Sequence, residues 1–209
     1  MSQGLDGHSL RSLLDHRAYG VSETSPESGY LDAARDCIVQ VGWRRTTLTD
    51  IARKAGVSRM TIYRRWPDTQ TLLADLLVRE WSGLLVDSGL ASDATGTTRD
   101  ALARGITGMV GALRVNALFL RIIELDPELL HPYLFERIGR NQKWILELTE
   151  QFVRDGQADG SVRAGDPHVL ANALLLTAYG YVLSAHTLDV DAETLDAELH
   201  LIVERYLAP

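Results

Sequence analysis

The chain has 209 residues, of which 45% are hydrophobic and 23% are charged, an ordinary balance for a soluble globular protein. It contains one cysteine, Cys37, which excludes an internal disulfide and a zinc cluster built on several cysteines. We expect Cys37 to be a buried structural thiol in a protein of a reducing compartment. The formal net charge of −7, taken alone, argues against a nucleic-acid partner.

The average charge conceals one strongly basic segment, from Gly42 to Trp66. Asp50 is the only acidic residue in it, so the segment carries +6 and the remainder of the chain −13. A local basic patch on an acidic body can bind nucleic acid, because counterion release depends on the local contacts. Charge alone leaves a solvated surface as an equal alternative. The basic residues are Arg44, Arg45, Arg53, Lys54, Arg59, Arg64 and Arg65.

Residues 1–28 are rich in Ser and Gly and show little periodicity, so we predict a flexible N-terminal arm. A basic start followed by an apolar region, which would mark a secretory signal, is not visible there. Arg11 and Arg17 could reach DNA as basic arms do, although a plain disordered tail is the simpler interpretation.

From Tyr30 onward the sequence indicates helices without a strong strand pattern, so we predict an all-α fold of about nine helices. The first helix covers about residues 30–41 and stops at Gly42, a good C-terminal cap. The second begins at Thr47, because residues 47–50 (TLTD) have the form of a capping box with Asp in place of Glu.

A tight turn follows the second helix. Gly56 permits the left-handed backbone that such a turn needs. Ser58 is the expected N-cap of a third helix, which Pro67 ends. Ala52 and Ala55 are small, so the third helix can cross the second closely. The two short helices, joined by the sequence AGVS, therefore form a compact helix-turn-helix.

The later helices are predicted from residue 68 or 69 to about 90 and then over about 98–113 and 116–125. Pro127 can sit in the first turn of the next helix, but Pro132 interrupts that stretch, so we expect a short turn and then a long helix to Arg154. The last two helices start at Asp166-Pro167 and at 191 or 192, and the last ends near 207. The run 169–185 carries no charge. It is short for a membrane span, which needs about 20 apolar residues. We therefore predict a buried helix, in a core or a subunit interface, rather than a membrane helix.

The exposed face of the third helix is expected to enter a DNA major groove, which is wide enough to admit an α-helix. Arg59 has the fork that pairs with guanine O6 and N7, and Met60 and Thr61 could contact a thymine methyl group. Tyr63 is placed to give its hydroxyl to a phosphate, while nearby arginines neutralise other phosphates. The alternative, a helical packing corner without a partner, leaves the concentrated arginines unexplained.

The run from Gly42 to Trp66, which reads IARKAGVSRMTIYRRW over residues 51–66, resembles the DNA-binding domain of the TetR (tetracycline-repressor-like) family. The resemblance covers about residues 30–80. It implies a homodimer, a double-stranded DNA operator with twofold symmetry and a divergent C-terminal ligand domain. Thr69 stands where the family usually has a phosphate-contacting lysine, and Arg65 stands where histidine is common.

We therefore predict a flexible arm over 1–28, a helix-turn-helix DNA-binding domain over 29–75 and a ligand-binding and dimerisation domain over 76–209. The expected function is that of a cytoplasmic, ligand-responsive repressor. Its two recognition helices must enter grooves about 34–36 Å apart, and an effector that changes this separation would release DNA. The predicted DNA contacts are Arg44, Arg45, Thr47, Thr49, Ser58, Arg59, Met60, Thr61, Tyr63, Arg64, Arg65 and Thr69.

Two helices near the C-terminus each carry an apolar stripe. On the last helix the stripe is Leu195, Leu199, Ile202 and Tyr206. On the uncharged helix it is Leu170, Leu174, Ala178 and Tyr181. Two such helices from each subunit could form a four-helix bundle, so we predict the dimer interface at Leu170, Leu174, Ala178, Leu195, Leu199, Ile202 and Tyr206. The alternative is a core within one chain.

A pocket for a small apolar or aromatic effector is expected in the C-terminal domain, as the resemblance implies. Ordinary core packing is the alternative for each of its candidate residues. These candidates are Met109, Phe119, Tyr133, Trp144, Phe152 and Tyr181.

Catalysis is not indicated. The four histidines at 131, 168, 186 and 200 share no metal-ligand spacing, and the sequence shows neither a phosphate-cradling loop nor a nucleophile elbow. Glu124, Asp126 and Glu128 surround Pro127 and are expected to mark a solvated helix junction. We therefore predict no enzyme activity, no metal, no cofactor and no membrane partner. A helical interaction protein that binds an acidic partner through the arginine patch is the alternative function.

Overall fold

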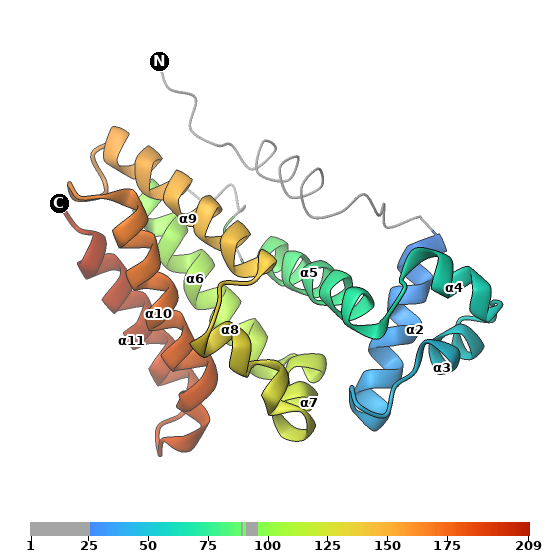
Figure 1. Cartoon of the computed structure of the whole chain (residues 1–209). Helices are drawn as coiled ribbons and strands as arrows, with labels where there is room; N and C mark the ends of the chain where they lie inside the picture. The colour runs from blue at the N-terminus through green and yellow to red at the C-terminus, as the bar shows by residue number, and fades with distance from the viewer. Residues whose placement is uncertain (1–25, 89, 91–95) are drawn as a thin grey trace. The chain divides into compact units, whose positions relative to one another are not determined.

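The computed structural model describes residues 26–88, 90 and 96–209 (Figure 1). Within these residues it has ten α-helices, two short 3-10 helices and no strand, which confirms the all-α prediction. The chain forms two compact units. The N-terminal unit contains the described residues up to Ser82 together with 115–138, and the C-terminal unit contains the rest.

The predicted arm lies outside the described residues except for its last three positions. Those three belong to the first described helix, α2 (Pro26–Val41), which begins four residues earlier than predicted. Gly42 then adopts a φ of +87° and ends the helix, as the sequence indicates. Cys37 is buried in α2, and desolvation raises the pKa of its thiol, which confirms the prediction of a buried cysteine.

The N-terminal unit is larger than the predicted 29–75 domain, because helices from beyond residue 114 share its core. Leu118 and Ile122 of α7 are fully buried in the same cluster as Ile38 of α2 and Ile62 of α4. Phe119, also on α7, packs edge-to-face on Trp81 with ring centroids 5.7 Å apart. The helices of this unit are α2, α3 (Leu48–Lys54), α4 (Arg59–Arg65), the first part of α5 (Thr69–Asp87), α7 (Ala117–Leu125), the 3-10 helix η1 (Pro127–Leu129) and α8 (His131–Phe135).

Ion pairs tie α5 to α2 inside the N-terminal unit. Arg35 of α2 reaches Glu80 of α5 at 3.0 Å, and Arg79 of α5 reaches Asp32 of α2 at 2.9 Å. Arg79 also donates a hydrogen bond of 2.9 Å to the carbonyl of Ser28. These polar contacts between the two helices fix α5 against α2.

The C-terminal unit is a group of helices in which α10 packs against α9 and α11 (Figure 1). Its helices are α6 (Thr98–Val115), α9 (Arg140–Ala158), α10 (Pro167–Ser184), the 3-10 helix η2 (Ala185–Thr187) and α11 (Ala192–Leu207). Phe152 and Val153 of α9 are buried, as are Leu170 and Leu174 of α10 and Leu199 of α11.

The predicted interruption at Pro132, a short turn followed by a long helix, is confirmed as α8 and then α9, which runs past Arg154 to Ala158. The backbone N–H groups of Glu136 and Arg137 both donate to the carbonyl of Pro132, which closes α8. Gly139 then takes an extended conformation and caps α9, where its N–H donates to Gln142 Oε1 at 2.6 Å. Glycine is tolerated as an N-cap residue, so the long helix begins here.

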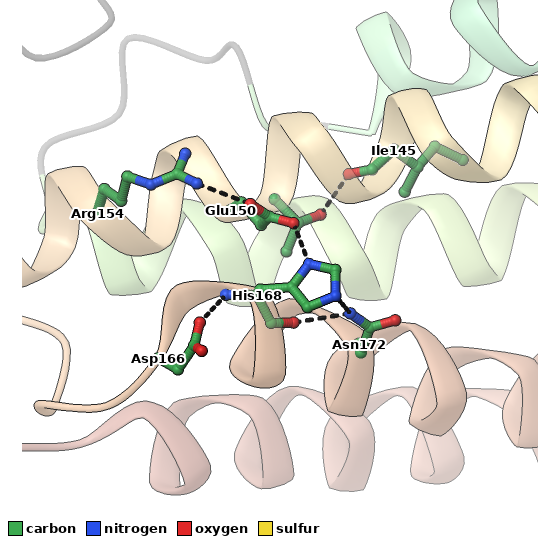
Figure 2. A network of polar contacts seen from close by, with 7 residues as sticks. Ile145, Glu150, Arg154, Asp166, His168 and Asn172 are labelled. Atoms are coloured by element: carbon green, nitrogen blue, oxygen red, sulfur yellow. Dashed lines mark hydrogen bonds and ion pairs between the residues drawn. The ribbon is translucent and has the colours of Figure 1, made fainter.

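A polar network joins α9 to the start of α10 (Figure 2). Glu150 accepts a hydrogen bond from Arg154 at 2.7 Å and lies 2.7 Å from His168 Nδ1. Asp166 accepts from the backbone N–H of His168 at 2.8 Å and so caps α10. The predicted start of α10 at Asp166-Pro167 is confirmed.

Only one face of α10 is buried within the chain. Leu170 and Leu174 are 2% and 3% exposed, whereas Val169 and Leu176 are 58% and 68% exposed. The stretch Pro167–Thr187 is long and apolar enough to cross a membrane, judged by length and composition only. The other face of α10 therefore presents apolar side chains that no part of the described chain covers.

Candidate nucleic-acid interface

A capping box holds the start of α3. The N–H of Asp50 donates to Thr47 Oγ1 at 3.1 Å, and the N–H of Thr47 donates to Asp50 Oδ2 at 3.3 Å. The hydrogen bond with the Thr47 side chain is the main cause that lowers the pKa of Asp50 below its ordinary value. The predicted capping box, with Asp in the place of Glu, is confirmed. Thr47 therefore uses its hydroxyl to begin the helix.

The turn between α3 and α4 also follows the prediction. Gly56 has a φ of +69°, which a residue with a side chain rarely adopts. The N–H of Val57 donates to the carbonyl of Ala52 at 3.0 Å and closes the turn. Ser58 then caps α4, because its Oγ accepts from the N–H of Thr61 at 3.2 Å. The two hydroxyls of Ser58 and Thr61 lie 2.9 Å apart.

Helix α4 has one anchored face and one exposed face. Ile62 and, directly after the helix, Trp66 are fully buried. On the other face Met60 is 74% exposed and Tyr63 is 45% exposed. An exposed basic helix that displays apolar side chains can meet both the phosphates and the thymine methyl groups of a major groove. Helix α4 thus has the form of a recognition helix.

The seven basic residues of the segment do not share one role. Four of them form ion pairs within the N-terminal unit. These pairs are Arg44 with Glu128, Arg53 with Asp50, Lys54 with Asp36 and Arg65 with Glu27. Among the described residues, Arg45, Arg59 and Arg64 form none, and all three are exposed. The unpaired basic charge of the segment is therefore concentrated on these three arginines.

Arg65 is exposed but makes several contacts within the N-terminal unit, and its predicted phosphate contact stays a prediction. Its Nε lies 2.9 Å from Glu27, its Nη2 lies 3.7 Å from Asp75, and its guanidinium stacks 5.2 Å from the ring of Trp66. The Arg65 side chain is still 41% exposed and a guanidinium has five N–H donors, so these contacts support the recognition helix without excluding a phosphate contact.

The remaining predicted contacts surround the two helices. Thr49 is half-buried in the first turn of α3, and Thr69 is the half-buried first residue of α5. The cap of α5 is Asp68, whose Oδ1 accepts from the N–H of Thr71 at 2.7 Å. Hydrogen bonding from the Thr71 N–H is the largest cause that lowers the pKa of Asp68. The Thr69 hydroxyl is therefore not used as the cap.

The junction at Asp126 is buried rather than solvated, so that prediction was wrong for this residue. Asp126 is 2% exposed. Its carboxylate accepts hydrogen bonds from the backbone N–H groups of Trp43 at 2.7 Å and Arg44 at 3.4 Å. The partners lie more than 80 positions away in sequence, which is why local patterns did not reveal the contact.

The six predicted pocket residues fall in both compact units. Phe119 and Tyr133 belong to the N-terminal unit, where Phe119 packs on Trp81 and Tyr133 lies beneath the guanidinium of Arg137 at 5.5 Å. The other four belong to the C-terminal unit. Among them Phe152 is buried, and Met109, Trp144 and Tyr181 are half-buried. Phe119 and Phe152 are core residues in this structure.

The predicted dimer residues also divide into two groups. Leu170, Leu174 and Leu199 are buried within the single chain, so this part of the predicted interface is corrected to core. Ile202 is 42% exposed. Ala178, Leu195 and Tyr206 are half-buried. Periodicity identified apolar stripes but not which side of each helix faces its own chain.

Comparison with known proteins identifies the class. The family described as "Bacterial regulatory proteins, tetR family" matches residues 31–76, which span α2, α3, α4 and the start of α5. An HTH-type transcriptional regulator of Mycobacterium tuberculosis is 37% identical over 179 residues, which cover 85% of this chain and 92% of that protein. The HTH-type regulator AlkX of the same species is 30% identical over 156 residues, 73% of this chain and 72% of AlkX.

Solved structures share the fold. The regulator FadR of Bacillus subtilis, in complex with stearoyl-CoA, has a TM-score of 0.66 at 17% identity and covers 87% of this chain and 99% of its own. The repressor AlkX of Dietzia sp. strain DQ12-45-1b has a TM-score of 0.63 at 20% identity and covers 89% of this chain and 97% of its own.

The fold and the exposed helix-turn-helix define a DNA-binding transcriptional regulator with a helical C-terminal ligand-binding domain. The chain belongs to the TetR family.

Proposed function

We propose that the protein is a ligand-responsive repressor that binds a palindromic operator as a homodimer in the cytoplasm. The exposed face of α4 carries this proposal: Met60 and Tyr63 are displayed there although each has a large apolar surface. Arg59 and Arg64 flank them, and neither forms an ion pair among the described residues. Such a face suits base edges and phosphates better than water.

Base reading is assigned to Arg59, Met60 and Thr61, with Arg59 on guanine and the other two on thymine methyl groups. Phosphate binding is assigned to Arg45, Arg64 and the Tyr63 hydroxyl. Thr47, Thr49, Ser58 and Thr69 lie at or near helix starts, where backbone N–H groups can also bind phosphate.

Dimerisation is proposed for the exposed sides of α10 and α11. Val169 and Leu176 are seven positions apart, so they lie on one side of α10, and both are more than half exposed. Ile202 is the exposed large apolar residue of α11. A second copy would remove this surface from water, and it would supply the second recognition helix that a palindrome requires.

The effector is proposed to be a small apolar molecule. Met109, Trp144 and Tyr181 are half-buried apolar side chains of the C-terminal unit, and they are its candidate lining. Two structural neighbours support an apolar ligand group, since one is in complex with stearoyl-CoA, which carries a long apolar acyl chain, and the other is implicated in the biodegradation of n-alkanes. Binding that favours a different separation of the recognition helices would release the operator.

DNA-binding selection from a randomised duplex library tests this function. We expect enrichment of a palindrome, with a dissociation constant on the order of 10⁻⁸–10⁻¹¹ M at physiological salt. A scrambled duplex of equal length is the control. Equal, weak binding to both duplexes would contradict the proposal and favour an acidic protein partner for the arginines. Release of the palindrome by acyl-CoA or n-alkane series then tests the effector class.

A further inference from the structure

The loop between α2 and α3 is held by a carboxylate from the end of α7. Asp126 accepts from the N–H groups of both Trp43 and Arg44, and its Oδ1 also lies 3.8 Å from Arg44 Nε. Within the loop, the N–H of Thr46 donates to the carbonyl of Trp43 at 3.0 Å. The backbone of Arg44 is therefore fixed, and the direction in which its side chain leaves the loop is fixed with it.

That direction brings Arg44 to a second acidic residue. Its Nη2 forms an ion pair with Oε1 of Glu128, the middle residue of η1. The Arg44 side chain is 69% exposed and that of Glu128 is 44% exposed, so the pair lies at the surface. Arg44 also lies in the loop that leads into α3, three residues before the N-cap Thr47. A phosphate that approached the start of α3 would thus meet Arg44 already neutralised.

We propose that Glu128 competes with the DNA backbone for Arg44 and so weakens binding to every DNA sequence alike. Asp126 is the positioning residue that holds Arg44 within reach of Glu128. An exposed ion pair is weak, so a phosphate can displace it. Binding of the phosphate nevertheless breaks the Arg44–Glu128 ion pair, and the free energy of that pair is subtracted from the DNA affinity of the wild type. This inference rests on the proposed DNA-binding function.

A double-mutant cycle on Arg44 and Glu128 tests the competition. The probes are the selected palindrome and a scrambled duplex, with the full-length chain as Glu128→Gln, Arg44→Gln and the double variant. Glu128→Gln should raise affinity for both duplexes by about two- to fivefold. In the Arg44→Gln background the same change should raise affinity by less than half of that factor, because Arg44, which Glu128→Gln would release for DNA, is no longer present.

Glu124→Gln is the matched control, since it removes the same charge from the same unit. Glu124 pairs with Arg121 at 2.9 Å and is exposed. It should change affinity less than Glu128→Gln. An unchanged affinity in Glu128→Gln, a gain equal to that of Glu124→Gln, or a gain that persists in the Arg44→Gln background would overturn the proposal. Failure of the wild type to bind either duplex would instead count against the DNA-binding function itself.

Discussion

The indole Nε1 of Trp66 donates a hydrogen bond of 2.9 Å to Oδ2 of Asp75. Trp66 is fully buried directly after the recognition helix, and Asp75 lies six residues after Thr69, the first residue of α5. Tyr30 of α2 packs edge-to-face on the same indole, with ring centroids 6.4 Å apart. The end of the recognition helix is therefore fixed to two other helices by one side chain.

Trp66→Phe removes this hydrogen bond and part of the packed volume. We expect a loss of about 1–3 kcal/mol in the free energy of unfolding, because the carboxylate of Asp75 loses a donor in a largely buried place. Urea unfolding followed by circular dichroism measures it. Tyr63→Phe is the control: it should leave stability within about 0.5 kcal/mol and weaken binding to all DNA sequences. Equal urea midpoints for Trp66→Phe and wild type would contradict the anchoring role.

Arg64 and Arg65 are adjacent, and we expect opposite phenotypes from them. Arg64→Ala should reduce the slope of log K against log salt by about 0.9 for one lost phosphate contact, with the melting temperature unchanged. Arg65→Ala should lower the melting temperature, since it breaks the pairs with Glu27 and Asp75. Fluorescence anisotropy over a salt series and thermal unfolding separate the two. A reduced salt slope with normal stability in Arg65→Ala would return this residue to the phosphate contacts.

Base preference should depend on the exposed tip of α4. Arg59→Ala should cost about 1–3 kcal/mol on the selected palindrome and little on a scrambled duplex, because a bidentate guanine contact is lost. Thr61→Ala should relax preference at a neighbouring position and also remove the partner of the Ser58 hydroxyl. Repeating the selection with each variant reads the preference directly. Unchanged discrimination by Arg59→Ala would remove it from the base readers.

Gly42 and Gly56 form a matched pair for a backbone test. Both have positive φ, +87° and +69°, so alanine at either position should cost about 1–2 kcal/mol. A Cβ at Gly42 would also lie 2.9 Å from Leu125 Cδ1, whereas a Cβ at Gly56 would have nothing within 4 Å. Gly42→Ala should therefore destabilise the chain more than Gly56→Ala. Urea midpoints of the two variants decide this, and the reverse order would show that the contact with Leu125 adds no cost.

Acid should destabilise the protein through its helix caps. The pKa values of Asp50, Asp68 and Asp191 are lowered from 3.8, chiefly by hydrogen bonds from Thr47, Thr71 and Thr194 respectively. The folded state therefore binds these protons less readily than the unfolded state. The stabilisation is present above pH 3.8 and is lost as the pH falls through the lower folded values.

Asp68→Asn tests the acid dependence at one cap. Asparagine caps a helix as well as aspartate, so stability at pH 7 should change little. The loss of stability between pH 5 and pH 3, measured as urea midpoints, should be smaller than in the wild type because one titrating group is removed. An identical pH profile for variant and wild type would show that Asp68 does not contribute to the linkage.

The helix-turn-helix could be predicted because its signals are local. The capping box of Thr47 and Asp50, the turn at Gly56 and the cap at Ser58 all involve residues within five positions of each other. By contrast, Asp126 meets Trp43 and Glu27 meets Arg65 across long separations, so no spacing rule could indicate them. The apolar stripes of α10 and α11 were visible, but periodicity does not tell whether Leu199 faces its own chain or a second one.

The residues of α4 that are exposed differ from those that anchor the helix, which decides where substitutions are tolerated. Met60, Tyr63 and Arg64 are exposed, and Arg64 forms no ion pair within the described part of the chain, while Trp66 and Arg65 anchor the same helix from the other side. Substitutions on the reading face are therefore close to neutral for folding. If the proposed reading face is correct, we expect that operator preference can change by substitution at a few surface positions of α4 without redesign of the core.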